Sequence, residues 1–290
     1  MSKRIGVIGG SGLYSLFDNG DVTQKKVDTP YGTPSDAYAI GLISGKEVVF
    51  LPRHGKGHRL LPSEVNYRAN IYGMKKLGVS EILSISAVGS LQKQYKPRDV
   101  VIVDQFFDRT TKRQNTFFGN GFVAHVAFGD PVCPDLRERI LSTAKKLKGT
   151  FHPKGTYVNM EGPQFSTRAE SNTYRSFGFD VIGMTNLTEA RLAREAEICY
   201  ATLAFVTDYD CWHEEEEAVT TDTILKVLQD NAENAKMIIA AVINNMGQTE
   251  KKCTCQDALK NSMITRPDEI PEPARTELHE IIRKYIHADE

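Results

Sequence analysis

Five cationic or protonatable side chains fall within seven residues of the chain, at Arg53-His54-Gly55-Lys56-Gly57-His58-Arg59. Guanidinium groups suit bidentate contact with phosphate oxygens. A solvated basic loop would have a similar composition. Gly55 and Gly57 carry no side chain, so the backbone can approach a ligand closely, which favours a ligand-binding loop. The stretch therefore predicts an oxyanion site in which Arg53, His54 and His58 take part.

A pair of carboxylates follows an apolar run at Tyr200–Val206, in the sequence Thr207-Asp208-Tyr209-Asp210-Cys211-Trp212. Side chains two residues apart on a strand point to the same side. Crowding of Asp208 and Asp210 should raise the pKa of at least one of them, as a proton donor near neutral pH requires. The alternative is an Asp-rich turn with no chemistry. We treat both carboxylates as catalytic candidates.

Two stretches of small residues could add anion donors. Gly9-Gly10-Ser11-Gly12 follows the first β-type run, where glycines let the backbone approach an anion and the serine adds a hydroxyl. It is not a dinucleotide fingerprint, because Ser15 stands where the third glycine would fall, and no Gly-Lys-Ser/Thr follows it. Alone, such a stretch is more often a tight turn. Ser84–Ser90 reads as a buried strand that ends in small hydroxyl residues.

A further loop precedes a helix. Thr167 and Glu170 have capping-box spacing, which places Phe165 and Ser166 just before a helix N-terminus, where free N–H groups can meet a ligand. Glu161 in the same loop could be catalytic or could pin the loop. The run His213 to Glu217 is interpreted as a solvated helix start, since one histidine beside glutamates lacks ligand geometry, and no metal site is predicted.

The elements that must position these residues alternate between strands and helices. Such alternation predicts an α/β fold, a single domain with a central mixed β-sheet flanked by helices. The mixed character follows from a hairpin at Ser44-Gly45-Lys46. The predicted strands are 4–8, 37–43, 47–52, 81–88, 100–104, 155–160, 180–184 and 200–207. The predicted helices are 63–76, 136–147, 167–176, 188–197 and 222–246.

Composition excludes several classes. The chain has 290 residues, with 36 Lys+Arg against 37 Asp+Glu, so the net charge of −1 argues against a dedicated nucleic-acid binder. The longest apolar stretches are far shorter than a membrane span, and a cytoplasmic protein is expected. We expect residues 1–246 to form the domain and residues 247–290 to form a C-terminal extension with a short amphipathic helix, which docks on its own subunit or on a neighbour.

The five cysteines are odd in number and irregular in spacing, which does not describe a secreted disulfide framework. Cys253-Thr254-Cys255 could be a redox or disulfide element, and two free surface thiols are an equal alternative. Arg53-His54-Gly55 also matches the Arg-His-Gly triplet of histidine phosphatases, in which the histidine is phosphorylated. That alternative is weaker because the phosphatase triplet follows the first strand of the domain.

Eight ordered blocks together resemble the trimeric nucleoside phosphorylases. The blocks are Gly6–Tyr14, Pro30–Asp36, Pro52–His58, Asn66–Asn70, Ser86–Leu91, Asp104–Phe106, Glu161–Ser171 and Thr207–Trp212. The resemblance covers about residues 4–246. It implies phosphorolysis of 5′-methylthioadenosine to adenine and 5-methylthioribose 1-phosphate, a step of purine and methionine salvage. It also implies a homotrimer or a dimer of trimers, inorganic phosphate as co-substrate and no cofactor.

The resemblance also implies roles for single residues. The expected phosphate ligands are Ser11, Arg53, His54, Ser86, the backbone N–H of Ala87, and Thr185. Met184 is expected to contact the ribose, Phe165 to form an aromatic wall, and His58 to bind substrate. His125, Thr221 and Leu225 are expected to line the site for the 5′-alkylthio group.

Base selectivity follows from the sense of the hydrogen bonds. In the family that the chain resembles, the branch acting on 6-oxopurines has Asn and Glu at the positions where this chain has Asp208 and Ser166. A carboxylate accepts from a 6-amino group and a serine can donate to N1, so adenine fits better. Asp208 is expected to serve N7, with Asp210 beside it at the purine edge. Adenosine, 6-oxopurine nucleosides or methylthioinosine remain alternative substrates, and a purine-binding module without turnover is an alternative function.

Overall fold

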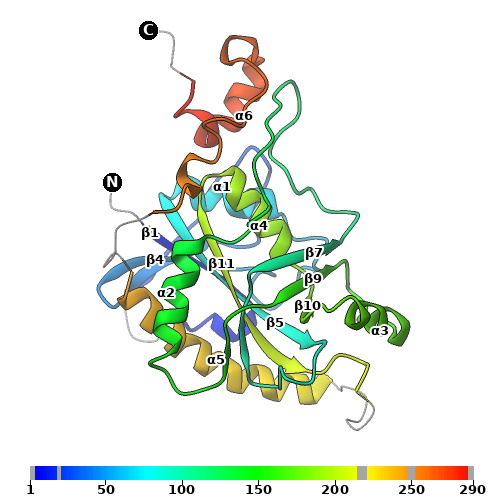
Figure 1. Cartoon of the computed structure of the whole chain (residues 1–290). Coiled ribbons are helices and arrows are strands. Elements are labelled where there is room, and N and C mark those ends of the chain that lie inside the picture. The colour runs from blue at the N-terminus through cyan, green and yellow to red at the C-terminus, as the bar shows by residue number, and fades with distance from the viewer. Residues whose placement is uncertain (1–3, 18–20, 214–220, 247–251, 287–290) are drawn as a thin grey trace.

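A computed structural model of the chain describes residues 4–17, 21–213, 221–246 and 252–286, and its centre is one mixed β-sheet (Figure 1). The path of hydrogen-bonded strands runs β2-β3-β4-β1-β5-β10-β9-β7, with β11 between β5 and β6 and with β8 beside β6. Their bounds are β1 Arg4–Gly9, β2 Thr23–Lys25, β3 Tyr38–Ile43, β4 Lys46–Pro52, β5 Val79–Ser90, β6 Val100–Ile102, β7 Gln105–Arg109, β8 Phe151–His152, β9 Thr156–Met160, β10 Val181–Gly183 and β11 Cys199–Asp208.

Four of the strands that lead to predicted site residues, β1, β4, β5 and β11, run parallel to one another. β1 pairs with β4 and β5, and β5 pairs with β11, all in the same direction. The carboxyl ends of parallel strands meet at one edge of a sheet, where α/β proteins bind ligands. The basic loop after β4 and the carboxylates after β11 are therefore brought to one edge of the sheet.

One edge of β5 changes partner partway along the strand. β1 covers it as far as Ser84, and β10 covers it antiparallel at Gly89 and Ser90. Residues 85–88 have no strand partner on that side within the described part of the chain. We call this stretch the β5 gap. In a strand, the N–H and C=O of one residue point to the same side, and residues i and i+2 share that side.

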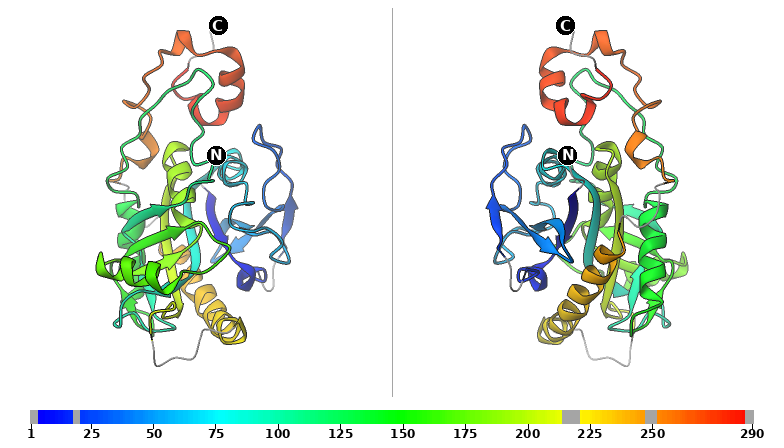
Figure 2. Two further views of the ribbon diagram at one scale, coloured as in Figure 1. Left: turned by 90° about the vertical axis from the view of Figure 1, so that its right-hand side faces the viewer. Right: turned by 90° about the vertical axis from the view of Figure 1, so that its left-hand side faces the viewer.

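Helices cover both faces of the sheet. Successive core residues of β1 and β5 alternate between two hydrophobic clusters, because strand side chains alternate between faces. One cluster contains residues of α1 (Tyr67–Lys76) and α4 (Asn186–Glu195), and the other contains residues of α2 (Pro134–Ala144) and α5 (Thr221–Asn244). α3 (Arg168–Ser176) stands at the side, beyond β10 and β9 (Figures 1 and 2).

Most predicted elements are confirmed, with boundary shifts of a few residues. Ser44 and Gly45 form a two-residue turn between β3 and β4, both with positive φ, as the predicted hairpin requires. Thr167 and Glu170 make the predicted capping box at the start of α3. The prediction missed β2, β7 and β8. β7 was missed because its residues alternate between half-buried and exposed, so it has no apolar run.

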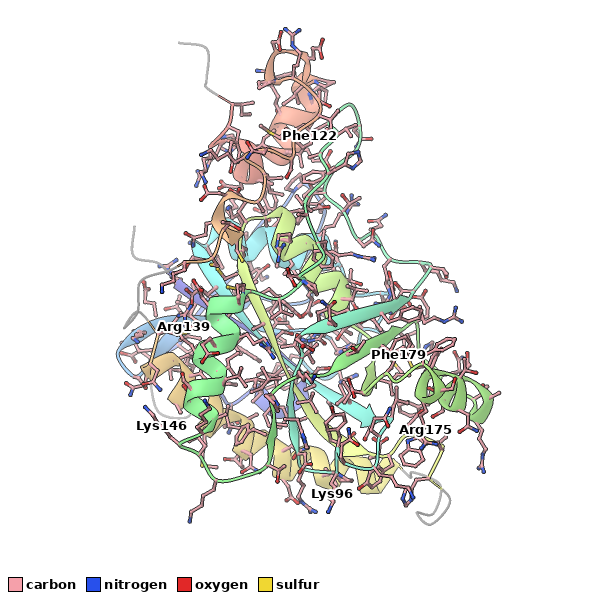
Figure 3. All side chains as sticks on the ribbon, viewed as in Figure 1. Lys96, Phe122, Arg139, Lys146, Arg175 and Phe179 are labelled. Carbon is pink, nitrogen blue, oxygen red and sulfur yellow. The ribbon has the colours of Figure 1, made fainter. Side chains whose placement is uncertain are left out.

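The C-terminal segment, residues 252–286, ends in α6 (Glu272–Ile282). Leu278, Ile281 and Ile282 of α6 are buried in the same hydrophobic cluster as α1, so the predicted amphipathic helix packs on its own chain. The loop that carries Phe122 lies beside this helix at the top of the view (Figure 3). No helix in the described ranges is long and apolar enough to cross a membrane.

Candidate active site

A cavity of about 450 Å³ opens at the carboxyl ends of β1, β4, β5 and β11. Its volume falls in the range of roughly 300–1,000 Å³ that is typical of small-molecule sites. Ten of the predicted site residues line it, from five separate segments of the chain. These are Arg53, His54, His58, Ser86, Ala87, Phe165, Met184, Thr185, Asp208 and Asp210.

Arg53 is held almost entirely by the protein. Its guanidinium is 3% exposed, with Nε 2.5 Å and Nη2 3.1 Å from the two carboxylate oxygens of Glu189. Nη2 also donates to Ser84 Oγ and Nη1 to the carbonyl of Ile85. Four of the five N–H donors are thus used. The expected bidentate grip on phosphate is wrong for this geometry, because one N–H of Nη1 is left for the cavity.

His54 faces the cavity as a neutral ring. Burial, reinforced by the charge of Arg53, lowers the pKa of His54 to about 4. Its Nδ1 lies 2.9 Å from the carbonyl of Leu60, so Nδ1 is the donor and Nε2 keeps its lone pair. The exposed ring of His58 stacks on it at a centroid distance of 4.4 Å, and burial of one face lowers the pKa of His58 as well. Neither ring is a fixed cation at neutral pH.

The loop that carries these histidines depends on its two glycines. Gly55 and Gly57 have φ of +70° and +82°, a region that side chains disfavour. The carbonyl of Gly55 accepts from Tyr14 Oη at 2.7 Å, and the N–H of Lys56 donates to Asp36 at 2.7 Å. The two glycines singled out in the sequence are therefore required by the backbone conformation of this turn.

The β5 gap supplies backbone donors. The carbonyl of Ile85 points into the gap, where it accepts from Arg53. The N–H of Ala87, two residues on, points to the same side. Ala87 is exposed to the cavity, whereas Ser86 is buried and its hydroxyl lies 3.3 Å from Tyr157 Oη. Gly10 and Gly12 line the cavity beside this strand, while the side chain of Ser11 lies outside the described residues.

Thr185 brings a helix N-terminus to the cavity. It caps α4 without a side-chain cap bond, and its hydroxyl donates to Asn186 Oδ1 at 3.0 Å. The positive partial charge at this end of α4 favours an anion in the cavity. The N–H of Leu187 in the first turn is already used, since it donates to Asn159 Oδ1 at 3.3 Å. Met184, half-buried, lines the cavity directly before this turn.

Asp208 and Asp210 form an acidic wall. Asp208 accepts from Thr207 Oγ1 at 2.6 Å and from the N–H of Asp210 at 2.7 Å. Oδ2 of Asp210 is buried and has no hydrogen-bond partner among the described residues. The pKa of each carboxyl is raised, mainly by burial, and the charge of Asp208 adds to the effect on Asp210. The sequence predicted the raised pKa but attributed it to crowding, which is the smaller cause.

Phe165 and Ser166 lie on opposite sides of their loop. Phe165 lines the cavity and is 69% exposed, whereas Ser166 is half-buried and outside the cavity lining. The Ser166 hydroxyl donates to the sulfur of Met160 at 3.9 Å. Its effect on the pKa of Asp210 shows that it is also near that carboxyl. Ser166 therefore lies behind the acidic wall.

Glu161 pins its loop. It accepts from the backbone of Thr111 and Lys112 and from Arg113, and it does not line the cavity. Burial acts to raise the pKa of Glu161, but these hydrogen bonds outweigh it and lower the pKa to about 2. Of the two interpretations of Glu161, the structure supports the positional one.

Besides Ser11 and Ser166, three further predicted residues are not placed in the cavity. His125 is exposed and lines a second cavity of about 480 Å³, formed by residues 116–126 and Glu195. Thr221 and Leu225 lie in the first turns of α5, and their side chains are outside the described residues. In one copy of the chain, His125 is therefore remote from the carboxylates.

Sequence reasoning missed Glu189 and Asn231. Glu189 is 1% exposed on α4 and also accepts from Ser84 and Tyr200. Asn231 on α5 lines the cavity, is 4% exposed, and its Oδ1 has no partner among the described residues. For Asn231, the available signal was its place in line with the apolar stripe of the predicted helix 222–246, which indicates a buried partner or ligand.

Residues 4–244 match the family model of the Phosphorylase superfamily, and the chain belongs to that superfamily. Among curated proteins, it is 54% identical over 286 residues to the S-methyl-5'-thioadenosine phosphorylase of Koribacter versatilis, covering 99% of this chain and 98% of the relative. The enzyme of that name from Thermofilum pendens is 50% identical over 261 residues, covering 90% of this chain and 98% of the relative.

Solved structures agree with the fold. A methylthioadenosine phosphorylase from an Antarctic soil metagenomic library superposes with a TM-score of 0.92 at 48% identity, covering 96% of this chain and 98% of the other. The methylthioadenosine phosphorylase of Schistosoma mansoni in complex with adenine has a TM-score of 0.85 at 36% identity, covering 91% and 99%. The predicted α/β single-domain fold is thereby confirmed. The Koribacter alignment also runs through nearly all of residues 247–290.

Proposed function

We propose that the chain cleaves 5′-methylthioadenosine with inorganic phosphate to give adenine and 5-methylthioribose 1-phosphate. The observation that carries this proposal is the composition of one cavity, which combines anion donors with two protonatable carboxyls. Curated relatives at about half identity over the full length carry the same activity in their names. The two products would feed methionine salvage and purine salvage.

The anion donors fit a phosphate. One N–H of Arg53, the N–H of Ala87 and the N-terminus of α4 converge on the cavity. The neutral His54 offers Nε2 as an acceptor for the proton of a hydrogen phosphate dianion. The hydroxyls of Ser86 and Thr185 can rotate from their present acceptors toward the anion, and Ser11 is proposed to add its hydroxyl.

The chemistry is a displacement at the anomeric carbon. A phosphate oxygen forms a bond to C1′ as the bond from C1′ to N9 breaks, and the electron pair passes into the purine, where N7 takes a proton. We assign that proton to Asp208, whose raised pKa favours the protonated form. The unpartnered Oδ2 of Asp210 accepts from the 6-amino group. No oxidation is involved, so the proposal needs no cofactor.

Phe165 and Met184 are proposed to hold the nucleoside. Phe165 presents an exposed ring at the cavity, which a bound base or sugar would cover, and Met184 precedes the turn that carries Thr185. His58 is proposed to close the ribose side of the cavity from the basic loop. The two carboxyls beside the purine select adenine over 6-oxopurines. A 6-oxopurine has a carbonyl acceptor at position 6, where it would face the Asp210 carboxylate, which is also an acceptor.

The 5′ pocket is proposed to need a second copy of the chain. His125 is exposed and belongs to a different cavity, yet relatives with this activity share the whole sequence region. In a homotrimer, the loop of residues 116–126 can reach the site of a neighbour, where His125 joins Thr221 and Leu225 around the methylthio group. We also propose a cytoplasmic location, where a reducing environment keeps cysteine thiols free.

One assay tests the function. The purified chain is incubated with 5′-methylthioadenosine, with and without inorganic phosphate, and adenine and the sugar phosphate are measured by chromatography. Adenine is expected only with phosphate, in equal amount to the sugar phosphate. A histidine phosphatase or a purine-binding module would release no adenine, which would refute the proposal. Adenosine, inosine and methylthioinosine in the same assay define the substrate range.

A further inference from the structure

Four of the five cysteines meet at one point of the fold. The sulfur atoms of Cys133, Cys199, Cys253 and Cys255 all lie within 4.8 Å of one another, and those of Cys199 and Cys253 are 3.6 Å apart. Cys133, Cys199 and Cys255 are buried and Cys253 is half-buried. Of the earlier alternatives, the pair of free surface thiols is therefore wrong for Cys255. We call these four residues the thiol cluster.

We propose that the thiol cluster binds one Zn²⁺ in a closed tetrahedral site that fastens the C-terminal segment to the sheet. Zinc bound by four thiolates has Zn–S distances of about 2.3 Å, and a tetrahedron of that size has S–S edges of about 3.8 Å. The sulfurs of Cys199 and Cys253 already lie close to this spacing, at 3.6 Å, and all four sulfurs lie within 4.8 Å of one another. Four protein ligands leave no open position, which is typical of structural rather than catalytic zinc.

The backbone around the thiol cluster holds the sulfurs together from three segments. The N–H of Cys133 donates to the carbonyl of Tyr200, which fixes Cys133 beside the first residue of β11. The N–H groups of Lys252 and Cys253 both donate to Asp135 Oδ2, at 2.6 and 2.8 Å. The Cys-x-Cys turn is thus fixed against the first turn of α2 before any ion binds.

The charge of the site is also accommodated. Zinc with four thiolates carries a charge of −2, and binding releases the four thiol protons. Cys133 caps the N-terminus of α2, whose partial positive charge favours thiolate. Arg139 (labelled in Figure 3) brings a positive charge nearby, because it pairs at 3.0 Å with both carboxylate oxygens of Glu81, the β5 residue that lies beside Cys199 in the sheet. The facing acids, Glu81 and Asp135, are held by Arg139 and by the two N–H groups.

The position indicates a structural role. Cys199 begins β11 and Asp208 ends it, so the thiol cluster and the acidic wall lie at opposite ends of a ten-residue strand, about 30 Å apart. The Cys-x-Cys turn begins the C-terminal segment, which makes an isolated bridge to Ala124 through Met263. The N–H of His125 also donates to the carbonyl of Ser262. The ion would thereby anchor the segment that supports the loop of residues 116–126.

The first test measures metal in the whole chain, purified without chelator under reducing, anaerobic conditions and desalted after exposure to ZnCl₂. One zinc per chain is expected by elemental analysis. Cobalt exchanged into the same protein should give the intense visible bands of tetrahedral thiolate-bound Co²⁺. This spectroscopic readout needs no substitution, so it does not depend on a variant that folds.

The second test uses matched variants. The double variant Cys253→Ser/Cys255→Ser should lose zinc at least tenfold, while Cys211→Ser, the cysteine outside the cluster, should keep one zinc per chain. Alkylation of the denatured, unreduced protein should find four free thiols in the cluster. Disulfides among them in anaerobically purified protein, or reduced protein that takes up no zinc, would overturn the proposal.

The fastening role has its own readout. Removal of zinc by a chelator should speed proteolytic cleavage within residues 252–286 severalfold, and added Zn²⁺ should restore protection. Equal cleavage rates in the zinc-loaded and stripped proteins would overturn the fastening role. Phosphorolysis is not used as a readout, so the outcome is independent of the proposed activity.

Discussion

Arg53 and Glu189 form a buried, two-point ion pair under the floor of the candidate active site. Their side chains are 3% and 1% exposed, and the pair aligns the guanidinium so that one N–H of Nη1 is left for a ligand. A guanidinium fixed in this way loses little freedom when an anion binds, because its orientation is already set.

Glu189→Gln should weaken both stability and phosphate binding. The substitution leaves the charge of Arg53 buried without its partner, which should reduce the free energy of unfolding by about 3–5 kcal/mol. The reoriented guanidinium should raise KM for phosphate roughly tenfold or more, because a charge-assisted hydrogen bond contributes about 1.5–3 kcal/mol. Urea unfolding and phosphate titration measure the two effects.

Asp268→Asn is the matched control for this variant. Asp268 pairs with Arg266 at 2.7 Å, but both side chains are more than 60% exposed. Water and salt screen an exposed ion pair, so stability and phosphate KM should stay close to those of the parent chain. Equal losses in the two variants would contradict the role given to burial.

Asp208→Asn should lower kcat/KM for adenine nucleosides by roughly 10²–10⁴-fold, because the amide cannot transfer a proton to N7. N7 and position 6 adjoin on the same purine edge, so the NH₂ group at position 208 can also donate to a 6-oxo acceptor, and the ratio of inosine to adenosine turnover should rise. Steady-state kinetics on both nucleosides measure the change. Unchanged adenine kinetics would refute the assignment of Asp208.

Asp210→Asn separates the two carboxyls. It removes one acceptor for the 6-amino group while Asp208 still supplies the proton, so KM for 5′-methylthioadenosine should rise more than kcat falls. A loss of kcat as large as that of Asp208→Asn would show that Asp210 takes part in the proton transfer.

His54 should make stability depend on pH. Its pKa is about 4 in the folded chain and near 6.5 when unfolded, so the unfolded chain binds the extra proton between these values. The free energy of unfolding should be unaffected above pH 6.5 and should fall toward pH 4, by about 3 kcal/mol in total. Urea unfolding at fixed protein concentration, from pH 7.5 to 4.5, measures the slope.

His54→Gln should flatten that slope, and the exposed His279→Gln on α6 should leave it unchanged. His58 has a lowered pKa of the same sign, so some slope should survive in His54→Gln. If His54→Gln retains the full slope of the parent chain, the buried neutral ring is not its source.

Gly55→Ala and Gly57→Ala test the basic loop by adding the same methyl group at two of its positions. Both positions have positive φ, but a Cβ at Gly55 would lie 2.9 Å from the carbonyl oxygen of Ser35, while at Gly57 nothing lies within 4 Å. Gly57→Ala should cost about 1 kcal/mol of stability with modest loss of activity. Gly55→Ala should displace His54 and reduce kcat/KM by at least a further order of magnitude, which steady-state kinetics will show.

The sequence predicted the parts of the site that follow from chain order. Parallel strands end at one edge, so the loop after β4 and the carboxylates after β11 meet there without further information. Capping at Thr167 is equally local, because the residues that make the bond are three apart. These features needed only periodicity and turn chemistry.

Features that depend on distant partners were not predicted. From the sequence alone, Glu189 is an ordinary helix residue. Only the folded structure shows that Arg53 pairs with it. The thiol cluster draws on positions 133, 199, 253 and 255, whose spacing matches no ligand pattern. The role of His125 stays a prediction, because it comes from similarity of sequence and in a single copy His125 lines a different cavity.

An anion bound in the β5 gap would take the place that a neighbouring strand occupies elsewhere along β5. A phosphate oxygen there would accept from Ala87 as the carbonyl of a neighbouring strand would, in the plane of the sheet rather than above its edge. Pairing with β1 before the gap and with β10 after it fixes both ends of residues 85–88. The recognition of the anion is thus governed by strand register, because a one-residue slip of β5 would move the N–H of Ala87 out of the gap and turn every side chain of β5 to the opposite face.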